Sequence, residues 1–309
     1  MIQAVQSKSL GHANFSKRGV RLIKIGLTLP INYLAGQATS ESDLLWTEMF
    51  STLEDCLSFL KQCGVRSIEI NRLKPSTDPK LMRRAVENIL SSDLKLTVHG
   101  WLPMEGRSEE LLRLLEAAEE VLRASDVTDT IACTVHGHHV LEPPNKEEAA
   151  QLTIKDLASL TQTLATMESL FVPALEVCRH KSGGPVGVTY TEVLEMANQV
   201  PHTPLGVCWD LGHSQVNYVE FGHVAFPEQP FLKRLIHTHI HDILPNGKTH
   251  GPLLNTDGYV QKSLRMIKDS GYQGVYNLEL YPDRWEGGPS ERKEALEISI
   301  KNLGLMLTN

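Results

Sequence analysis

The chain has 309 residues, of which 41% are hydrophobic and 22% charged, a composition typical of a globular protein in water. Its formal net charge of −7 argues against a nucleic-acid partner, because an acidic surface repels phosphate backbones. The sequence has no run of 18 or more apolar residues, so we expect no membrane-spanning helix.

The amino-terminal residues are polar and show no periodicity. They lack the apolar stretch and the cleavage pattern of a signal peptide, so we expect a flexible extension over residues 1–20. Among the five cysteines, Cys133, Cys178 and Cys208 lie in apolar, strand-like runs, and no pair has metal-binding spacing. Buried, reduced thiols are typical of a reducing compartment, so the sequence predicts a cytoplasmic protein.

From residue 21 onward, short apolar runs alternate with amphipathic stretches that have helical spacing. Eight runs occur, at residues 20–30, 65–73, 94–102, 129–140, 170–178, 204–213, 235–243 and 274–282. This alternation continues without a change in composition and predicts a single α/β domain, a (β/α)₈ or TIM barrel over residues 21–309. The alternative, an open doubly wound sheet, is disfavoured because no GxGxxG phosphate loop follows an early strand.

Histidines and carboxylates gather at the ends of these runs, where barrel enzymes build their sites. In chain order they are His99, His136, Glu176, Asp210, His213, His239, His241 and Glu279. The seventh run, LIHTHIHDI, adds His237, and its alternation places three imidazoles on one face. Convergent carboxylates repel each other unless a cation neutralises them, and mixed nitrogen and oxygen ligands suit Zn²⁺, Mn²⁺ or Co²⁺.

Each of these residues also has a structural interpretation. A single histidine on a strand is more often a hydrogen-bonded core residue than a ligand. Glu279 could cap a helix or pair with Arg284, and His237 could be hydrogen-bonded deeper in the barrel. Glu69 is equally compatible with an interior polar residue and with a salt-bridge partner at the bottom of the barrel.

The ordered set GVRSIEI, LEV, WDLGH, HIHD and DSGYQGVYNLEL resembles the xylose isomerase-like barrel superfamily over residues 21–309. That superfamily includes sugar isomerases, epimerases and dehydratases, and also endonuclease IV (AP endonuclease family 2). The resemblance implies one metal site, built from Glu176, Asp210, His239 and Glu279. It also implies that Glu176 and Glu279 move a substrate proton, and that His213 contacts substrate oxygens.

This chemistry follows from simple principles. A metal that binds a carbonyl and the adjacent hydroxyl acidifies the C–H bond between them, and two carboxylates can transfer the proton through an enediolate. We therefore expect a sugar or polyol isomerase or epimerase that uses a divalent metal. His213 or Lys248 would polarise an oxygen, Trp101 and His241 are further candidates for substrate contact, and the segment 243–258 could close over the substrate. A barrel that only binds its ligand, and a homo-oligomer, both stay open.

Endonuclease IV suggests an alternative, a multinuclear zinc hydrolase that acts on a phosphoester or related bond. The resemblance to that enzyme places His99, His136 and His250 as possible ligands of further metal ions. Lys248 stands in GKTHG where that family has an aspartate, and an ammonium group cannot bind a cation. A DNA substrate also requires a basic groove, which the loop sequences do not provide, so we expect a small-molecule substrate.

Overall fold

Eight parallel strands form a closed barrel in the computed structural model, which describes residues 23–104, 107–140, 145–201 and 204–308. The extension expected over residues 1–20 lies outside the described residues. The strands are β1 (Ile25–Pro30), β2 (Val65–Asn71), β3 (Lys95–His99), β4 (Ile131–Val135), β5 (Phe171–Glu176), β6 (Gly206–Asp210), β7 (Leu235–Ile240) and β8 (Tyr276–Leu278). Each pairs with the next, and β8 pairs with β1. All eight predicted strands and the (β/α)₈ barrel are confirmed.

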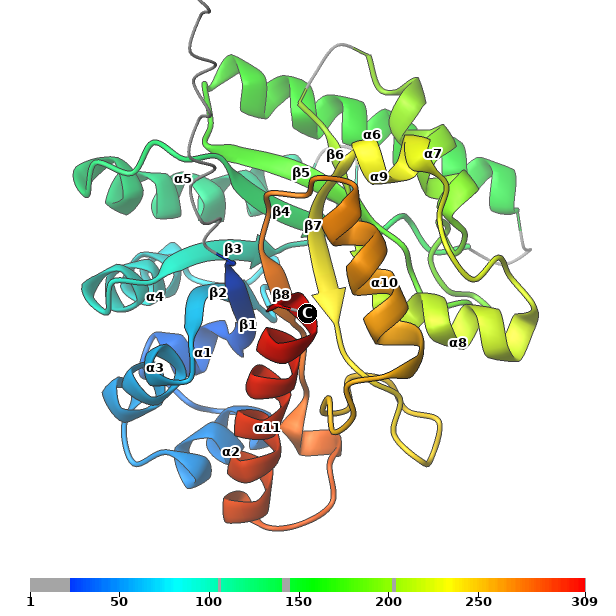
Figure 1. The fold of residues 1–309 in the computed structure, drawn as a ribbon. Coiled ribbons are helices and arrows are strands. Elements are labelled where there is room, and N and C mark those ends of the chain that lie inside the picture. Colours follow the sequence, from blue (N-terminus) through cyan, green and yellow to red (C-terminus); the bar gives the residue numbers. More distant parts are fainter. Residues whose placement is uncertain (1–22, 105–106, 141–144, 202–203, 309) are drawn as a thin grey trace, which may run out of the picture.

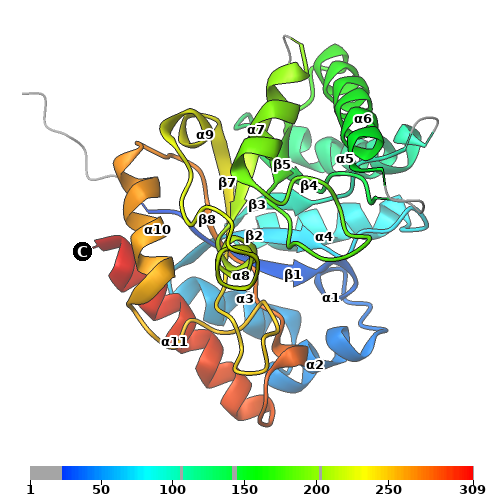
Figure 2. The same cartoon turned by 90° about the vertical axis from the view of Figure 1, so that its right-hand side faces the viewer.

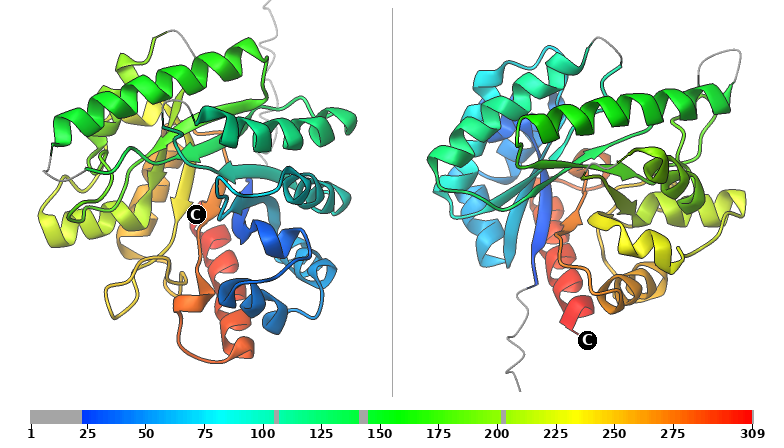
Figure 3. Two further views of the ribbon diagram at one scale, coloured as in Figure 1. Left: turned by 180° about the vertical axis from the view of Figure 1, so that it is seen from behind. Right: turned by 90° about the horizontal axis from the view of Figure 1, so that it is seen from above.

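Helices surround the barrel on its outside (Figure 1; Figure 2). They are α1 (Ile31–Leu34), α2 (Glu41–Met49), α3 (Leu53–Gln62), α4 (Pro79–Ser91), α5 (Ser108–Ala124), α6 (Lys146–Thr166), α7 (Tyr190–Gln199), α8 (Leu211–Phe221), α9 (Gln229–Lys233), α10 (Gly258–Asp269) and α11 (Pro289–Thr308), with a 3₁₀ turn η1 (Pro282–Arg284). Figure 3 shows the same layer from behind and from above. In the described part of the chain, no helix combines the length and apolar composition that a membrane crossing needs.

Local capping explains where several helices begin. The Asp78 side chain accepts a hydrogen bond from the Lys80 amide, and Pro79 occupies the first helical position of α4. The Thr52 side chain accepts from the Asp55 amide at the start of α3. Helix α8 follows β6 without a loop, because Asp210 is both the last residue of the strand and the cap of the helix. A candidate site residue is thus held by two elements at once.

The inside of the barrel is polar at its centre. Glu69 on β2 is fully buried and accepts hydrogen bonds from Thr28 on β1 and Asn277 on β8. His237 and His239, both on β7, lie 2.7 and 3.1 Å from the same carboxylate. These contacts place Glu69 inside the barrel, paired with imidazoles. They also agree with the interpretation that His237 is hydrogen-bonded in the barrel interior.

Apolar side chains fill the layer between barrel and helices. Trp209 is fully buried there, with its ring edge-on to Tyr190 at 5.7 Å and to Phe231 at 6.5 Å. Its indole N–H donates to Ser214 in the first turn of α8. Trp101, by contrast, is only partly buried against the edge of the core. Cys133, Cys178 and Cys208 are buried and free, as the sequence predicted.

The contrast between the two tryptophans gives a test of the packing. We predict that Trp209→Ala lowers the free energy of unfolding by about 3–5 kcal/mol, because it leaves a cavity between two rings. Trp101→Ala, the matched control, should cost less than half as much. Urea titrations followed by far-UV circular dichroism measure both values, and equal losses would contradict this account of the core.

Candidate metal centre

Four buried residues from adjacent strands converge at the carboxyl end of the barrel. Glu176 ends β5, Asp210 ends β6, His239 lies in β7 and Glu279 follows β8, and each is at most 1% exposed. One oxygen or nitrogen atom from each lies within 4.8 Å of the others. The structure therefore brings together all four residues that the resemblance implied.

His239 is at the centre of this group. Its Nδ1 atom lies 3.3 Å from Glu176 Oε2, 3.4 Å from Glu279 Oε2 and 3.9 Å from Asp210 Oδ2. Its other nitrogen, Nε2, lies 3.1 Å from the Glu69 carboxylate, which can only accept. Nε2 therefore carries a proton, and Nδ1 is the nitrogen that faces the centre, where loss of its own proton would expose a lone pair to a cation.

Several buried atoms in this centre have no hydrogen-bond partner in the protein. They include Glu176 Oε1, His239 Nδ1 and Glu279 Oε2. Buried polar atoms are almost always satisfied, so unpartnered atoms clustered among these residues are consistent with a bound ligand. Three carboxylates and one imidazole lone pair suit a divalent cation of the zinc, manganese or cobalt type.

The charges in the protein alone are balanced by histidines. Burial raises the pKa of Glu176, but the positive charges of His136 and His239 outweigh it and hold the pKa well below the ordinary value. Burial lowers the pKa of His99, yet hydrogen bonding and charge attraction from Glu279 and attraction from Glu176 raise it to about 9. The pKa values of His99 and His239 are both raised, so these imidazoles carry positive charge beside the carboxylates in the protein without an ion.

His99 and His136 form a second group next to the first. Their Nε2 atoms lie 3.2 Å apart, and His136 Nε2 lies 3.1 Å from Glu176 Oε2. The nearest nitrogen of His99 lies 3.3 Å from Glu279 Oε1. His99, His136 and Glu176 also have a geometry that could hold an ion. The two extra histidines predicted from the third and fourth strands are therefore placed together.

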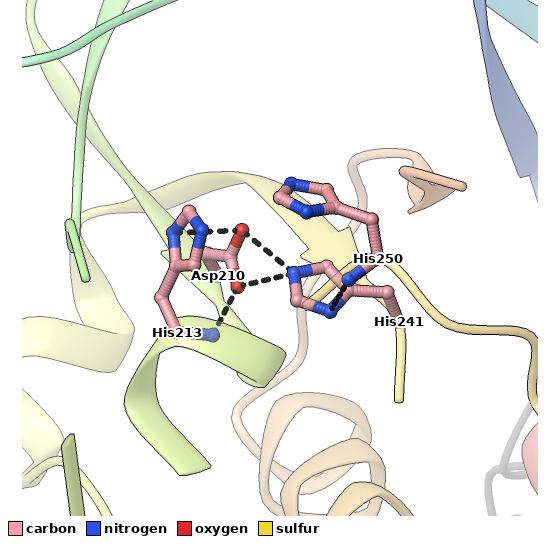
Figure 4. Close-up of side chains that lie close together, drawn as sticks. All are labelled: Asp210, His213, His241 and His250. Atoms are coloured by element: carbon pink, nitrogen blue, oxygen red, sulfur yellow. Dashed lines mark hydrogen bonds and ion pairs between the residues drawn. The ribbon is translucent and has the colours of Figure 1, made fainter. Parts of the chain in front are cut away.

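The imidazoles of His213 and His241 both lie next to the Asp210 carboxylate (Figure 4). The Asp210 carboxylate accepts from the His213 amide at 2.7 Å, which begins helix α8, and His213 Nδ1 lies 3.1 Å from Asp210 Oδ2. His241 Nε2 lies 3.1 Å from Asp210 Oδ1. A Cβ atom on Gly212 would lie 1.8 Å from the His241 ring, so the glycine of WDLGH allows helix and imidazole to meet.

The loop after β7 brings His250 to the site, but the side chain of Lys248 does not reach it. Asp242 and Gly251 pair as an antiparallel bridge, which folds residues 242–251 back on themselves. His250 Nε2 lies 3.3 Å from Glu279 Oε2. The Lys248 side chain is exposed, and its hydrogen bonds within the described residues are made by its backbone. No described contact joins Lys248 or Trp101 to the four-residue centre, so their substrate roles remain predictions.

One residue of the site was missed from the sequence, and another was given the wrong partner. The Tyr281 hydroxyl donates to Glu279 Oε1 at 2.9 Å, and its ring stacks on His250 with centroids 4.1 Å apart. Arg284, considered as a partner for Glu279, instead contacts His250 Nδ1 at 2.9 Å. The spacing of residues 279 and 281, two positions apart, was the available signal for Tyr281.

Comparison with known proteins agrees with this fold. A family model described as xylose isomerase-like TIM barrel matches residues 57–303. A stretch of 136 residues is 29% identical to an uncharacterized protein of Methanocaldococcus jannaschii, covering 42% of this chain and 49% of that protein. The chain thus matches about half the length of this relative.

Solved structures share the fold at low identity. An L-ribulose 3-epimerase superposes with a TM-score of 0.61 at 14% identity, covering 93% of this chain and 95% of the other. The IOLI protein, solved with a bound zinc atom, has a TM-score of 0.59 at 15% identity, with 91% and 98% covered. Likeness at such identity is a likeness of fold.

The raised pKa of His99 makes the stability of the metal-free protein depend on pH. A histidine whose pKa rises from 6.5 to about 9 on folding stabilises the folded state fully below pH 6.5 and loses this effect as the pH passes 9. We predict that chelator-treated protein loses about 3 kcal/mol between these values, measured by urea unfolding. His213 and His239, whose pKa values are also raised, keep part of the slope, so His99→Asn should reduce it, and an equal slope in this variant would refute the assignment.

Proposed function

We propose that this chain, which belongs to the xylose isomerase-like TIM barrel family, is a sugar or polyol isomerase or epimerase that depends on a divalent metal. The observation that carries the proposal is the buried convergence of Glu176, Asp210, His239 and Glu279 with unpartnered atoms. The sugar epimerase among the structural neighbours supports the same class of reaction.

Glu176, Asp210, His239 and Glu279 would hold the ion. Bound there, a divalent cation supplies Lewis-acid polarisation of a carbonyl and a neighbouring hydroxyl. Glu69 accepts a hydrogen bond from the Nε2–H of His239. This contact directs Nδ1 of the same ring toward the ion. The zinc atom bound by the IOLI protein, which has the same fold, supports this assignment.

Two carboxylates would then transfer the proton. Glu176 and Glu279 come from strands β5 and β8, so they approach the centre from different parts of the barrel wall. One takes the proton from the carbon next to the carbonyl, and the other returns a proton to the enediolate. His213, at the first turn of α8 and 11% exposed, would contact a substrate oxygen.

A second candidate is a multinuclear zinc hydrolase, favoured by one observation. The group of His99, His136 and Glu176 gives a further set of ligand atoms beside the first. The number of ions per chain separates the two candidates. Elemental analysis giving one ion supports the isomerase, and two or three zinc ions support a hydrolase.

Solvent deuterium exchange tests the isomerase directly. In D₂O, the protein loaded with Mn²⁺, Co²⁺ or Zn²⁺ should incorporate deuterium next to the carbonyl of one or more ketoses in a panel, detected by proton NMR. Glu176→Gln and Glu279→Gln should each lower that rate by at least about 100-fold. Elemental analysis of each variant separates loss of the proton carrier from loss of the ion.

The control for this experiment is Glu119→Gln. Glu119 is also buried, but it lies on α5 outside the barrel, where it accepts from the Leu170 amide. Its substitution should leave exchange unchanged. A wild-type protein that exchanges no ketose with any of the three metals would contradict the proposed function.

Removal of the Glu69 charge tests the support of His239. We predict that Glu69→Gln raises the dissociation constant for Zn²⁺ about 10- to 100-fold, because an amide does not hold the His239 proton on Nε2 as a carboxylate does. Competition with a chromophoric chelator measures the constant. An affinity equal to that of the wild type would mean that Glu69 serves only the packing of the barrel.

A further inference from the structure

The side of the site beside Asp210 resembles a second metal site at first inspection. Asp210, His213, His241 and His250 each offer one atom within 4.8 Å of the others. Figure 4 shows the three imidazoles gathered around this carboxylate. Whether an imidazole can bind a cation depends on which nitrogen carries the proton, and the partners of each ring decide that.

The proton of His241 is on Nε2. The backbone N–H of His250 donates to His241 Nδ1 at 3.0 Å, so that nitrogen must accept. The Asp242 carbonyl lies 3.3 Å from the same nitrogen. A proton on Nδ1 would, however, point at the N–H of His250, which is closer. Nε2 faces the Asp210 carboxylate at 3.1 and 3.3 Å, which requires a donor. His241 therefore donates to Asp210 and has no lone pair for a cation there.

The proton of His250 is also on Nε2, for a different reason. Its Nδ1 lies 2.9 Å from Arg284 Nη1, and a guanidinium group can only donate. The Thr249 hydroxyl lies 2.8 Å from the same Nδ1. Nε2 thus carries the proton and lies 3.3 Å from the Glu279 carboxylate.

The surrounding structure holds the His250 ring in this orientation. The ring lies between His241, with centroids 4.3 Å apart, and Tyr281, at 4.1 Å. Its backbone adopts the left-handed conformation with φ of 69°, and its carbonyl accepts from the indole of Trp285. A non-glycine residue in this conformation is strained and persists where its surroundings fix it.

We propose that His241 and His250 are fixed N–H donors, and that the group of Asp210, His213, His241 and His250 holds no metal ion of its own besides the one at the four-residue centre. His241 positions Asp210 through its hydrogen bond. The Nε2–H of His250 is left to donate to an oxygen of a substrate bound at the neighbouring four-residue centre. The guanidinium of Arg284 further disfavours a cation on this side by charge repulsion. Only the substrate role of His250 rests on the proposed function.

Nitrogen NMR of the protein labelled with ¹⁵N-histidine tests the proton positions. His241→Asn and His250→Asn identify the signals by their loss. In the wild type, both rings should show a protonated Nε2 and an unprotonated Nδ1, with and without saturating Zn²⁺. A Zn²⁺-induced shift typical of metal ligation at either Nε2 would overturn the proposal.

Arg284→Gln tests the cause of the His250 tautomer. Without the guanidinium, the His250 signals should move toward a mixture of tautomers, while those of His241 stay in place. Arg83→Gln is the matched control, because Arg83 pairs with Glu120 on the outer helices. Unchanged His250 signals in Arg284→Gln would overturn the role of Arg284.

Metal counts give an independent readout. Asparagine tolerates the left-handed backbone of His250, so His250→Asn should fold. At saturating Zn²⁺ it should bind as many ions per chain as the wild type, and one ion fewer would overturn the proposal. His241→Asn should raise the dissociation constant of the bound ion about 10- to 100-fold, because Asp210 loses its donor.

The substrate role has its own test. On a ketose that the wild type exchanges, His250→Asn should raise KM or lower kcat, and His250→Gln should restore part of the loss, because its amide N–H reaches farther toward the position of Nε2. No effect of His250→Asn would overturn this role. If no ketose is exchanged, the proposed function and this role fail together, while the proton positions and the metal count stand.

Discussion

A fully buried carboxylate at the middle of the barrel, Glu69, constrains much of the rest. An ionised group without solvent is costly unless it is paired and hydrogen-bonded. Here Thr28, Asn277, His237 and His239 supply those partners from strands β1, β8 and β7. The same contacts link β1 to β8, where the barrel closes. They also place a proton on Nε2 of His239. The hydrogen bonds that the buried Glu69 carboxylate requires therefore also orient the His239 ring toward the four-residue centre.

Three histidines near that centre have the same side chain and different chemistry. His239 meets a carboxylate at Nε2 and offers Nδ1, whereas His241 and His250 receive donors at Nδ1 and become donors at Nε2. Residue type and spacing alone would give all three the same role. Their different partners, which are a buried glutamate, a backbone amide and an exposed arginine, separate them.

The barrel and the convergence of strand-end residues could be predicted from local pattern, whereas the resemblance to the superfamily singled out the four central residues among the candidates. Strand–helix alternation fixes where strands end, and parallel strands end on one face, so Glu176, Asp210, His239 and Glu279 had to approach each other. Lys248, Trp101 and Arg284 lie in loops or turns, where side-chain direction depends on contacts distant in sequence. Glu69 was ambiguous because alternation places it inside the barrel without giving its height along the axis. Its partners on β1, β7 and β8 became visible only in three dimensions.

Asp210 ends a strand, caps helix α8 and faces the centre, and the residue before it is Trp209. The indole of Trp209 bonds to Ser214 in the very turn that Asp210 begins. Binding of an ion or substrate that displaces the Asp210 carboxylate would therefore also change the hydrogen bond between Trp209 and Ser214, and Trp209 is a fluorophore packed between the barrel and the helices. We therefore expect Trp209, which is shielded from solvent and linked to the centre through one turn of helix, to be a fluorescent reporter of binding at the centre.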